Sequence, residues 1–271
     1  MPAPALSVTN LALSYDGQRL VHPLTFSMQA GECVALLGAS GSGKSLTAAA
    51  LTGTVPDGIT ASGEVSFGGE PGIGAWKVAG RTTATAANAA LIRQDPQSSL
   101  NPLVPVGKQL LMPLRRAGFR RTDAWTHAAR FLAQAGITEP AAILPRYTGE
   151  LSGGQLQRVC IALALACGSR VLVADEPTTA LDAVTQAKVL ATLRTWGAEG
   201  RSVLFITHDL SAAASLCSRA LVMEGGRIVE EAPMTELLCT PRHPYTRRLV
   251  AAATGALPLA APATLKTAVA A

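Results

Sequence analysis

The sequence predicts an α/β fold with a mostly parallel, buried core sheet. Three short apolar runs have the composition of buried parallel strands: Cys33–Leu37, Val171–Ala174 and Val203–Ile206. A glycine-rich stretch follows the first run. Lys44–Leu51 then predicts a helix, and Gly53 is placed to end it. Strand, loop and helix in this order are typical of α/β folds.

Other strands are expected on either side of this unit. Residues 5–35 predict short strands with a turn at Asp16-Gly17, and Glu64–Phe67 predicts another strand. Ala220–Val229 is split by a glycine pair and predicts a hairpin.

Residues 103–147 have a helical character. Thr122 is predicted to cap a helix through Ala135, with Gly136 closing it. The apolar positions of this helix fall on one face: Ala124, Ala128, Phe131, Leu132 and Ala135. Gln155–Cys167 predicts a second, mostly apolar helix that is buried. These helices form an insertion between the α/β segments.

The composition fits a chain with a sizeable core. Hydrophobic residues make up 48% of the 271 residues, and charged residues make up 15%. The net charge of +5 is weak evidence for any acidic partner, so no nucleic-acid binding is expected. The five cysteines are widely spaced and predict buried or semi-buried free thiols in a reducing cytosol.

No targeting or membrane segment is expected. Met1–Leu13 has neither Lys nor Arg and no long apolar run, so it does not resemble a secretory signal. The most apolar segment, Val159–Cys167, has about half the length that spans a bilayer.

The glycine-rich stretch fits the phosphate-binding pattern G-x-x-x-x-G-K-S in full. We call it the phosphate loop; its residues are Gly38, Ala39, Ser40, Gly41, Ser42, Gly43, Lys44 and Ser45. Glycines let backbone N–H groups converge on phosphate oxygens, and the helix N-terminus favours negative charge. Lys44 should reach the β- and γ-phosphates, and Ser45 should ligate Mg²⁺. The loop therefore predicts a nucleoside triphosphate site.

Polar residues at the ends of other strands should gather at this loop, because parallel strands share one carboxyl edge. Asp175 is placed to hold Mg²⁺, directly or through water, and Glu176 to polarise the attacking water as general base. A neutral His208 can hydrogen-bond a γ-phosphate or orient the water. Gln94 follows another strand and can sense Mg²⁺ and the nucleophilic water. Each of these residues, taken alone, could have a purely structural role. Their positions at the ends of buried strands near the phosphate loop favour a role in the site.

A second stretch suited to phosphate lies far downstream. We call it the signature segment; its residues are Leu151, Ser152, Gly153, Gly154 and Gln155. Free N–H groups, a hydroxyl and two residues without side chains form an anion site. No lysine and no strand accompany it, so a capped helix start explains it equally well. Two phosphate surfaces indicate two copies of such a domain that share each nucleotide.

Taken together, these motifs resemble the ATP-binding subunit of an ABC transporter, from about residue 6 to 250. The signature segment matches that family's signature letter for letter, the phosphate loop matches Walker A, and Val171–Glu176 matches Walker B. Gln94 matches the Q-loop, Thr179–Asp182 the D-loop and His208 the switch histidine. Tyr15 occupies the place of the aromatic residue that stacks on adenine.

The resemblance implies the fold of a P-loop NTPase of the ABC ATPase type. It adds an N-terminal antiparallel β-subdomain and a helical subdomain inserted at about residues 97–167. The ATPase domain is expected to span residues 1–252, followed by a poorly ordered low-complexity tail at 253–271.

The resemblance also implies a mechanism with ATP and Mg²⁺. Two ATPase domains meet head to tail, so that Ser152, Gly153 and Gly154 of one contact the γ-phosphate held by Lys44 of the other. Asp182 couples the two sites. The second ATPase is a copy or, as the resemblance favours, a paralogue. Two membrane permease subunits and a periplasmic or surface substrate-binding protein complete the system at the cytoplasmic face of the inner membrane.

A narrower resemblance points to the peptide/opine/nickel importer subfamily. It depends on Gln94–Pro102 and His243–Leu249. Many peptide-importing members continue with a cysteine-rich segment after the second stretch, which this sequence lacks. Gly43–Thr47 is also similar to the nickel members, so nickel or metal-chelate import is expected, with di- or oligopeptide import as the alternative. Tyr147–Glu150 departs from the subfamily's usual sequence before the signature.

Two other classes compete with a transporter subunit. A soluble ABC protein of translation or DNA repair usually carries two ATPase domains or a long coiled-coil insertion, whereas this sequence has one phosphate loop and no heptad run. A P-loop enzyme outside the ABC family, such as a small kinase or GTPase, would leave the signature segment unexplained.

Overall fold

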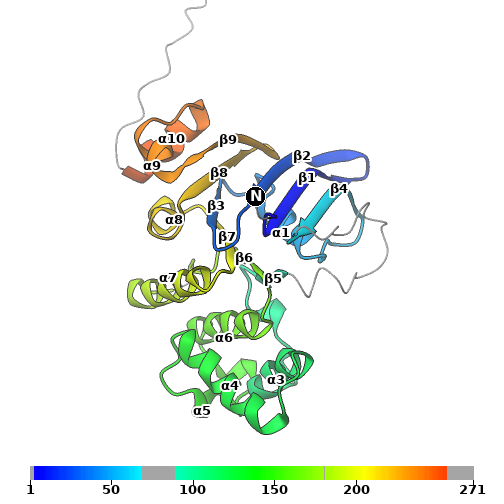
Figure 1. Cartoon of the computed structure of the whole chain (residues 1–271), viewed down its shortest axis with the longest axis vertical. Coiled ribbons are helices and arrows are strands. Elements are labelled where there is room, and N and C mark those ends of the chain that lie inside the picture. The colour runs from blue at the N-terminus through cyan, green and yellow to red at the C-terminus, as the bar shows by residue number, and fades with distance from the viewer. Residues whose placement is uncertain (1–2, 69–88, 180, 255–271) are drawn as a thin grey trace, which may run out of the picture.

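The computed structural model describes residues 3–68, 89–179 and 181–254. At its centre lies a six-stranded sheet of order β5-β6-β7-β3-β8-β9, in which only the β8–β9 pair is antiparallel (Figure 1). The strands of this sheet are β3 (Cys33–Leu37), β5 (Ala89–Ile92), β6 (Val171–Asp175), β7 (Ser202–Thr207), β8 (Arg219–Glu224) and β9 (Arg227–Pro233). The predicted parallel core and the predicted hairpin are both confirmed.

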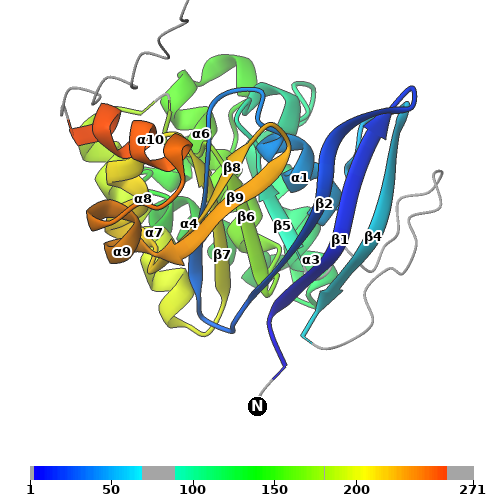
Figure 2. The same cartoon turned by 90° about the horizontal axis from the view of Figure 1, so that it is seen from above.

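A second, antiparallel sheet of order β2-β1-β4 stands beside the central sheet (Figure 2). Its strands are β1 (Leu6–Tyr15), β2 (Gln18–Met28) and β4 (Ile59–Phe67). Asp16 and Gly17 make the turn between the first two strands, as predicted, and both have positive φ. The strand expected at Glu64–Phe67 begins earlier, at Ile59, because it pairs with β1 along its whole length.

The central sheet is buried on both faces, which explains why its strands are continuous apolar runs. Val34 and Leu36 of β3 pack in the core shared with the antiparallel sheet and α1 (Lys44–Leu51). Ala35 and Leu37 pack in the core on the other face, among the helices. Successive side chains of a strand point to opposite faces, so β3 joins the two cores.

The remaining helices lie beyond the other face and the ends of the central sheet, some against its strands and others farther out. They are α3 (Val106–Arg116), α4 (Arg121–Gln134), α5 (Pro140–Ile143), α6 (Gly153–Ala166), α7 (Ala183–Ala198), α8 (Leu210–Leu216), α9 (Met234–Cys239) and α10 (Pro244–Thr254). Short 3₁₀ helices lie at Gln97–Ser99 and Thr148–Glu150. Helices α3, α4 and α5 gather around α6, away from the antiparallel sheet (Figure 1).

The prediction that Thr122 caps α4 is wrong. The helix begins at Arg121 with Arg120 as its N-cap residue, so Thr122 is already inside the first turn and its hydroxyl contacts the Asp123 carboxylate at 3.3 Å. The predicted end is correct, since Gly136 has a positive φ just beyond the helix. Its predicted inner face is also correct: Ala124, Ala128, Leu132 and Ala135 are buried and Phe131 packs against them.

All five cysteines are free thiols, as predicted, but Cys167 and Cys239 are exposed rather than buried or semi-buried, because they lie at the ends of α6 and α9. Across the described ranges, no helix combines the length and apolar character that a membrane span requires. Of the tail predicted at 253–271, residues 253 and 254 end α10, and 255–271 lie outside the described residues, as does Ala180 of the D-loop match.

Candidate functional site

Four neighbouring strands deliver the predicted site residues to one edge of the central sheet. Gln94 lies after β5, Asp175 ends β6 and Glu176 comes next, His208 follows β7, and the phosphate loop follows β3. These elements surround one cavity of about 570 Å³, which we call the loop cavity. It is lined by Leu20, Ser40, Gly41, Gly43, Lys44, Ser45, Leu46, Gln94, Asp175, Glu176 and His208. The structure therefore brings Gln94, Asp175, Glu176 and His208 together at the phosphate loop, as predicted from the strand ends.

Lys44 opens helix α1 and is almost fully buried. Its ammonium donates hydrogen bonds to the carbonyl oxygens of Gly38 and Ala39, both at 2.8 Å. Burial lowers the pKa of Lys44, and the nearby carboxylates of Glu176 and Asp175 oppose that shift. The phosphate loop is thus folded around a cation that phosphate oxygens can take over from the two carbonyls.

The phosphate loop packs tightly against the β8–β9 hairpin, and this contact requires glycine. A Cβ atom at Gly38 would lie 2.3 Å from the carbonyl oxygen of Met223. Gly43 has a φ of 102°, and a Cβ there would lie 2.9 Å from Cε of Met223. The Gly226 N–H also donates to the Ser42 carbonyl oxygen at 3.0 Å. The hairpin therefore fixes the shape of the loop.

Glu176 is held by four protein donors around a buried carboxylate. Its Oε1 lies 2.8 Å from Nδ1 of His208 and accepts the His208 backbone N–H at 3.1 Å. Its Oε2 accepts the hydroxyls of Thr179 at 2.7 Å and Thr207 at 3.4 Å. Glu176 also has a positive φ of 49°, which is uncommon outside glycine and tends to occur at functional sites. The geometry suits a general base whose carboxylate is held in one orientation.

Asp175 provides the conditions for a cation. It is 6% exposed, and its Oδ1 is buried without a hydrogen-bond partner among the described residues. Burial raises its pKa, as does Glu176, while the Ser45 hydroxyl and Lys44 act in the opposite direction. An unpaired carboxylate oxygen in a cavity that Ser45 and Gln94 also line fits Mg²⁺, which often takes one or two carboxylates and substrate phosphates as ligands.

The signature segment lies outside the loop cavity, and none of its five described residues lines it. Ser152 caps α6: its hydroxyl accepts the Gln155 N–H at 3.3 Å, and the Gln155 side chain accepts the Ser152 N–H at 3.0 Å. Ser152 and Gly153 are exposed, and a Cβ at Gly153 would meet no atom within 4 Å. The segment is therefore both a capped helix start and an open surface.

Tyr15 and Asp182 also lie outside the loop cavity. Tyr15 is 55% exposed at the end of β1, with its ring beside Gly58. Asp182 caps α7 by accepting the N–H and the hydroxyl of Thr185, at 2.9 Å and 2.7 Å. These hydrogen bonds lower the pKa of Asp182.

Sequence reasoning missed several residues at the site. Leu20 of β2 lines the loop cavity, and Thr207 holds Glu176. Tyr245 of α10 accepts the Ala39 N–H on its hydroxyl oxygen at 2.6 Å. The last of these had a signal, because Tyr245 lies in the stretch His243–Leu249 that suggested the subfamily, although no role at the site was expected there.

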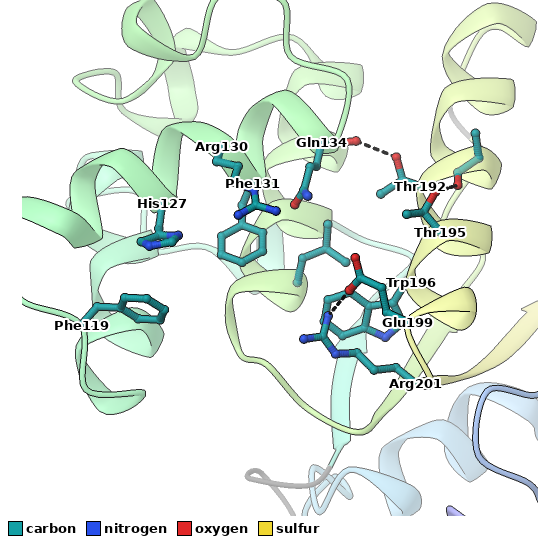
Figure 3. Close-up of a pocket in the computed structure, with 12 residues that line it drawn as sticks. Phe119, His127, Arg130, Phe131, Gln134, Thr192, Thr195, Trp196, Glu199 and Arg201 are labelled. Carbon is teal, nitrogen blue, oxygen red and sulfur yellow. Dashed lines mark hydrogen bonds and ion pairs between the residues drawn. The ribbon is translucent and has the colours of Figure 1, made fainter.

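A second cavity, of about 380 Å³, lies between α4 and α7 (Figure 3). It is lined by Phe119, His127, Arg130, Phe131, Gln134, Leu165, Ala191, Thr192, Thr195, Trp196, Glu199 and Arg201. Arg201 stacks on the Trp196 ring at 4.0 Å and pairs with Glu199 at 2.9 Å. None of the predicted site residues reaches this cavity.

The sequence matches known proteins over most of its length. The family described as "ABC transporter" matches residues 21–179. The glutathione import ATP-binding protein GsiA of Pectobacterium atrosepticum is 41% identical over 260 residues, covering 91% of this chain and 42% of that protein. GsiA of Escherichia coli is 39% identical, covering 92% of this chain and 41% of that protein. The chain thus spans about two-fifths of the length of these curated relatives.

Solved structures of ATP-binding cassettes share the fold. A dimeric, post-hydrolysis cassette bound to ADP and phosphate superposes with a TM-score of 0.74 at 25% identity, covering 84% of this chain and 98% of that one. A bacterial Atm1-family ABC exporter with ATP bound gives a TM-score of 0.76 at 27% identity, covering 93% of this chain and 42% of that one. The chain therefore belongs to the ABC transporter family and has the fold of that family's ATPase domain.

Proposed function

We propose that the chain binds and hydrolyses ATP to drive an ABC importer for glutathione or another small peptide. The observation that supports ATP hydrolysis is that Lys44, Asp175 and the Glu176–His208 pair line one cavity. The relatives named for glutathione import support the class of cargo.

The chain's own residues divide the chemistry between them. Lys44 and the N–H groups at the start of α1 bind the β- and γ-phosphates of ATP. Glu176 accepts a proton from the attacking water, and His208 holds its carboxylate in place. Ser45, Gln94 and Asp175 hold Mg²⁺, which when bound neutralises charge on the phosphates.

The other half of each site comes from a second ATPase domain, a copy or a paralogue. Its residues Ser152, Gly153 and Gly154 cover the γ-phosphate, and its Asp182 couples the two sites. The exposed ring of Tyr15 stacks on adenine. The open, capped start of α6 supports this arrangement, because it presents free N–H groups at the molecular surface.

Partner subunits complete the proposed system. Two membrane permeases contact the helical insertion at about 97–167, within an ATPase domain of residues 1–252. A periplasmic or surface binding protein delivers the cargo, and the chain works at the cytoplasmic face of the inner membrane. The group formed by α3, α4 and α5 supports this, since it projects from the central sheet on the side away from the antiparallel sheet (Figure 1).

The expectation of nickel or metal-chelate import gives way to peptide import. That expectation depended on two local features: the short region after His243–Leu249 and the sequence Gly43–Thr47. The similarity to glutathione import proteins extends over 91% of the chain. Glutathione is a small peptide, so the alternative stated above is favoured over nickel.

Uptake measurements test the cargo. In a strain that lacks this chain, restoring the wild-type chain is expected to restore uptake of labelled glutathione or dipeptide but not of labelled nickel. The Glu176→Gln variant, which keeps the protein present without its general base, is the matched negative control. Restoration of nickel uptake alone would reject the peptide assignment.

Replacing Ser152 with Arg is expected to leave ATP binding intact and to reduce hydrolysis about tenfold or more. The bulky Arg side chain would stand where the γ-phosphate bound by the partner domain should dock. Loss of the cap also costs about 1 kcal/mol of stability, so unfolding should be followed in parallel. Ser215→Arg, an exposed serine near the end of α8, is the control and should retain activity. Full hydrolysis by the Ser152→Arg variant would contradict the shared site.

A further inference from the structure

We propose that Tyr245 of helix α10 is a positioning residue for ATP binding. Its hydroxyl holds the start of the phosphate loop in place. The Ala39 N–H donates to its hydroxyl oxygen at 2.6 Å, across 206 positions of sequence. This inference rests on the proposed function, because it assumes that ATP binds at the loop. Tyr245 does not line the loop cavity, so its action on ATP is through Ala39.

The Ala39 residue is held from two sides. Tyr245 accepts its N–H, while the Lys44 ammonium at 2.8 Å and the Ser42 N–H at 3.2 Å donate to its carbonyl oxygen. When phosphate oxygens draw the Lys44 ammonium away, the carbonyl contact weakens. The contact with Tyr245 does not depend on Lys44 and remains. Its effect is to keep the first turn of the loop in place while the lysine changes partners.

Tyr245 itself is firmly anchored. The carboxylate of Glu230 on β9 accepts the N–H groups of Arg242 and His243, at 2.9 Å and 2.8 Å, just before α10 begins. Thr246, the next residue in the helix, is fully buried. Arg248 lies over the Tyr245 ring at 5.8 Å and also bonds to Glu224 of β8. The hydroxyl is therefore presented to Ala39 by a helix fixed to the same hairpin that packs on the loop.

The position of Ala39 decides which kinetic step should respond. Ala39 lies at the opposite end of the loop from Ser45 and makes no contact with Glu176 or His208 among the described hydrogen bonds. Loss of the Tyr245 hydroxyl should therefore leave proton transfer unchanged and weaken phosphate binding. A general loss of folding would instead lower turnover and stability together.

The test is Tyr245→Phe, which keeps the ring and removes only the hydroxyl. The dissociation constant for ATP, measured calorimetrically with Mg²⁺, and the KM for ATP should both rise about three- to tenfold, the effect of one ordinary hydrogen bond. The kcat should stay within about twofold of wild type, since the base is not touched. The melting temperature of the variant is recorded alongside.

Two controls separate the hydroxyl from the helix that carries it. Arg247→Gln changes an exposed arginine of the same helix but keeps the hydroxyl, and Tyr147→Phe removes the hydroxyl of another partly exposed tyrosine. Both should keep the wild-type KM. An unchanged KM in Tyr245→Phe, or an equal rise in Arg247→Gln, would overturn the inference. A wild-type chain that binds no ATP would instead reject the proposed function, and this inference with it.

Discussion

The Glu176→Gln variant is expected to bind ATP but to hydrolyse it about 100-fold more slowly or worse, which is the effect of removing a general base. Glutamine keeps the size of the side chain and can still accept the Thr179 hydroxyl, so the local fold should survive. It cannot take a proton from water. If ATP holds two domains together until it is hydrolysed, this variant should accumulate as a dimer with ATP.

Light scattering after gel filtration, with and without ATP and Mg²⁺, measures that dimer, and phosphate release measures turnover. Glu199→Gln is a matched control, because Glu199 pairs with Arg201, which precedes β7, whereas His208 beside the base follows the other end of that strand. It should show wild-type turnover. A Glu176→Gln variant that stays monomeric with ATP bound would argue against two domains sharing the nucleotide.

The Lys44→Ala variant is expected to lose hydrolysis by about 100-fold or more, since it removes a charge that stabilises the transferring phosphoryl group. ATP affinity should fall as well. The Lys44 ammonium also joins the carbonyl oxygens of Gly38 and Ala39, so its removal leaves only the Ser42 N–H, at 3.2 Å, to hold the Ala39 carbonyl from within the loop. The lost charge and the altered loop should both lower the rate of hydrolysis.

Lys44→Arg separates charge from shape, because it keeps the cation but not the compact ammonium that fits between two carbonyls. Lys188→Ala, an exposed lysine on α7, is the control and should behave as wild type. Phosphate release and ATP titration are the measurements. Normal turnover in Lys44→Ala would place the phosphate site elsewhere.

The sequence predicted the central sheet and much of the loop cavity for the same physical reason. Buried parallel strands must be apolar, and their carboxyl ends share one edge, so Gln94, Asp175 and His208 could be placed together without coordinates. The role of each residue in catalysis stays a prediction. Cap positions were less predictable: Thr122 has the right chemistry, but the backbone becomes helical one residue earlier.

Contacts between distant segments could not be predicted. The positive φ of Glu176 and its bond from Thr207 depend on how β6 and β7 align, which no local pattern encodes. The contact between Tyr245 and Ala39 joins residues that are 206 positions apart, and no periodic pattern in the sequence indicates it. The cargo was harder still, because cargo is chosen by partner subunits and leaves little trace in an ATPase.

The capped start of α6 has a consequence for how two domains would part and meet again. In the cap, the Ser152 hydroxyl only accepts a hydrogen bond, from the Gln155 N–H. A hydroxyl also carries one proton to donate, so Ser152 can reach a neighbouring phosphate without giving up its own helix. Each round of docking would then be a rigid-body event at this surface, with no segment to refold and little conformational entropy lost there.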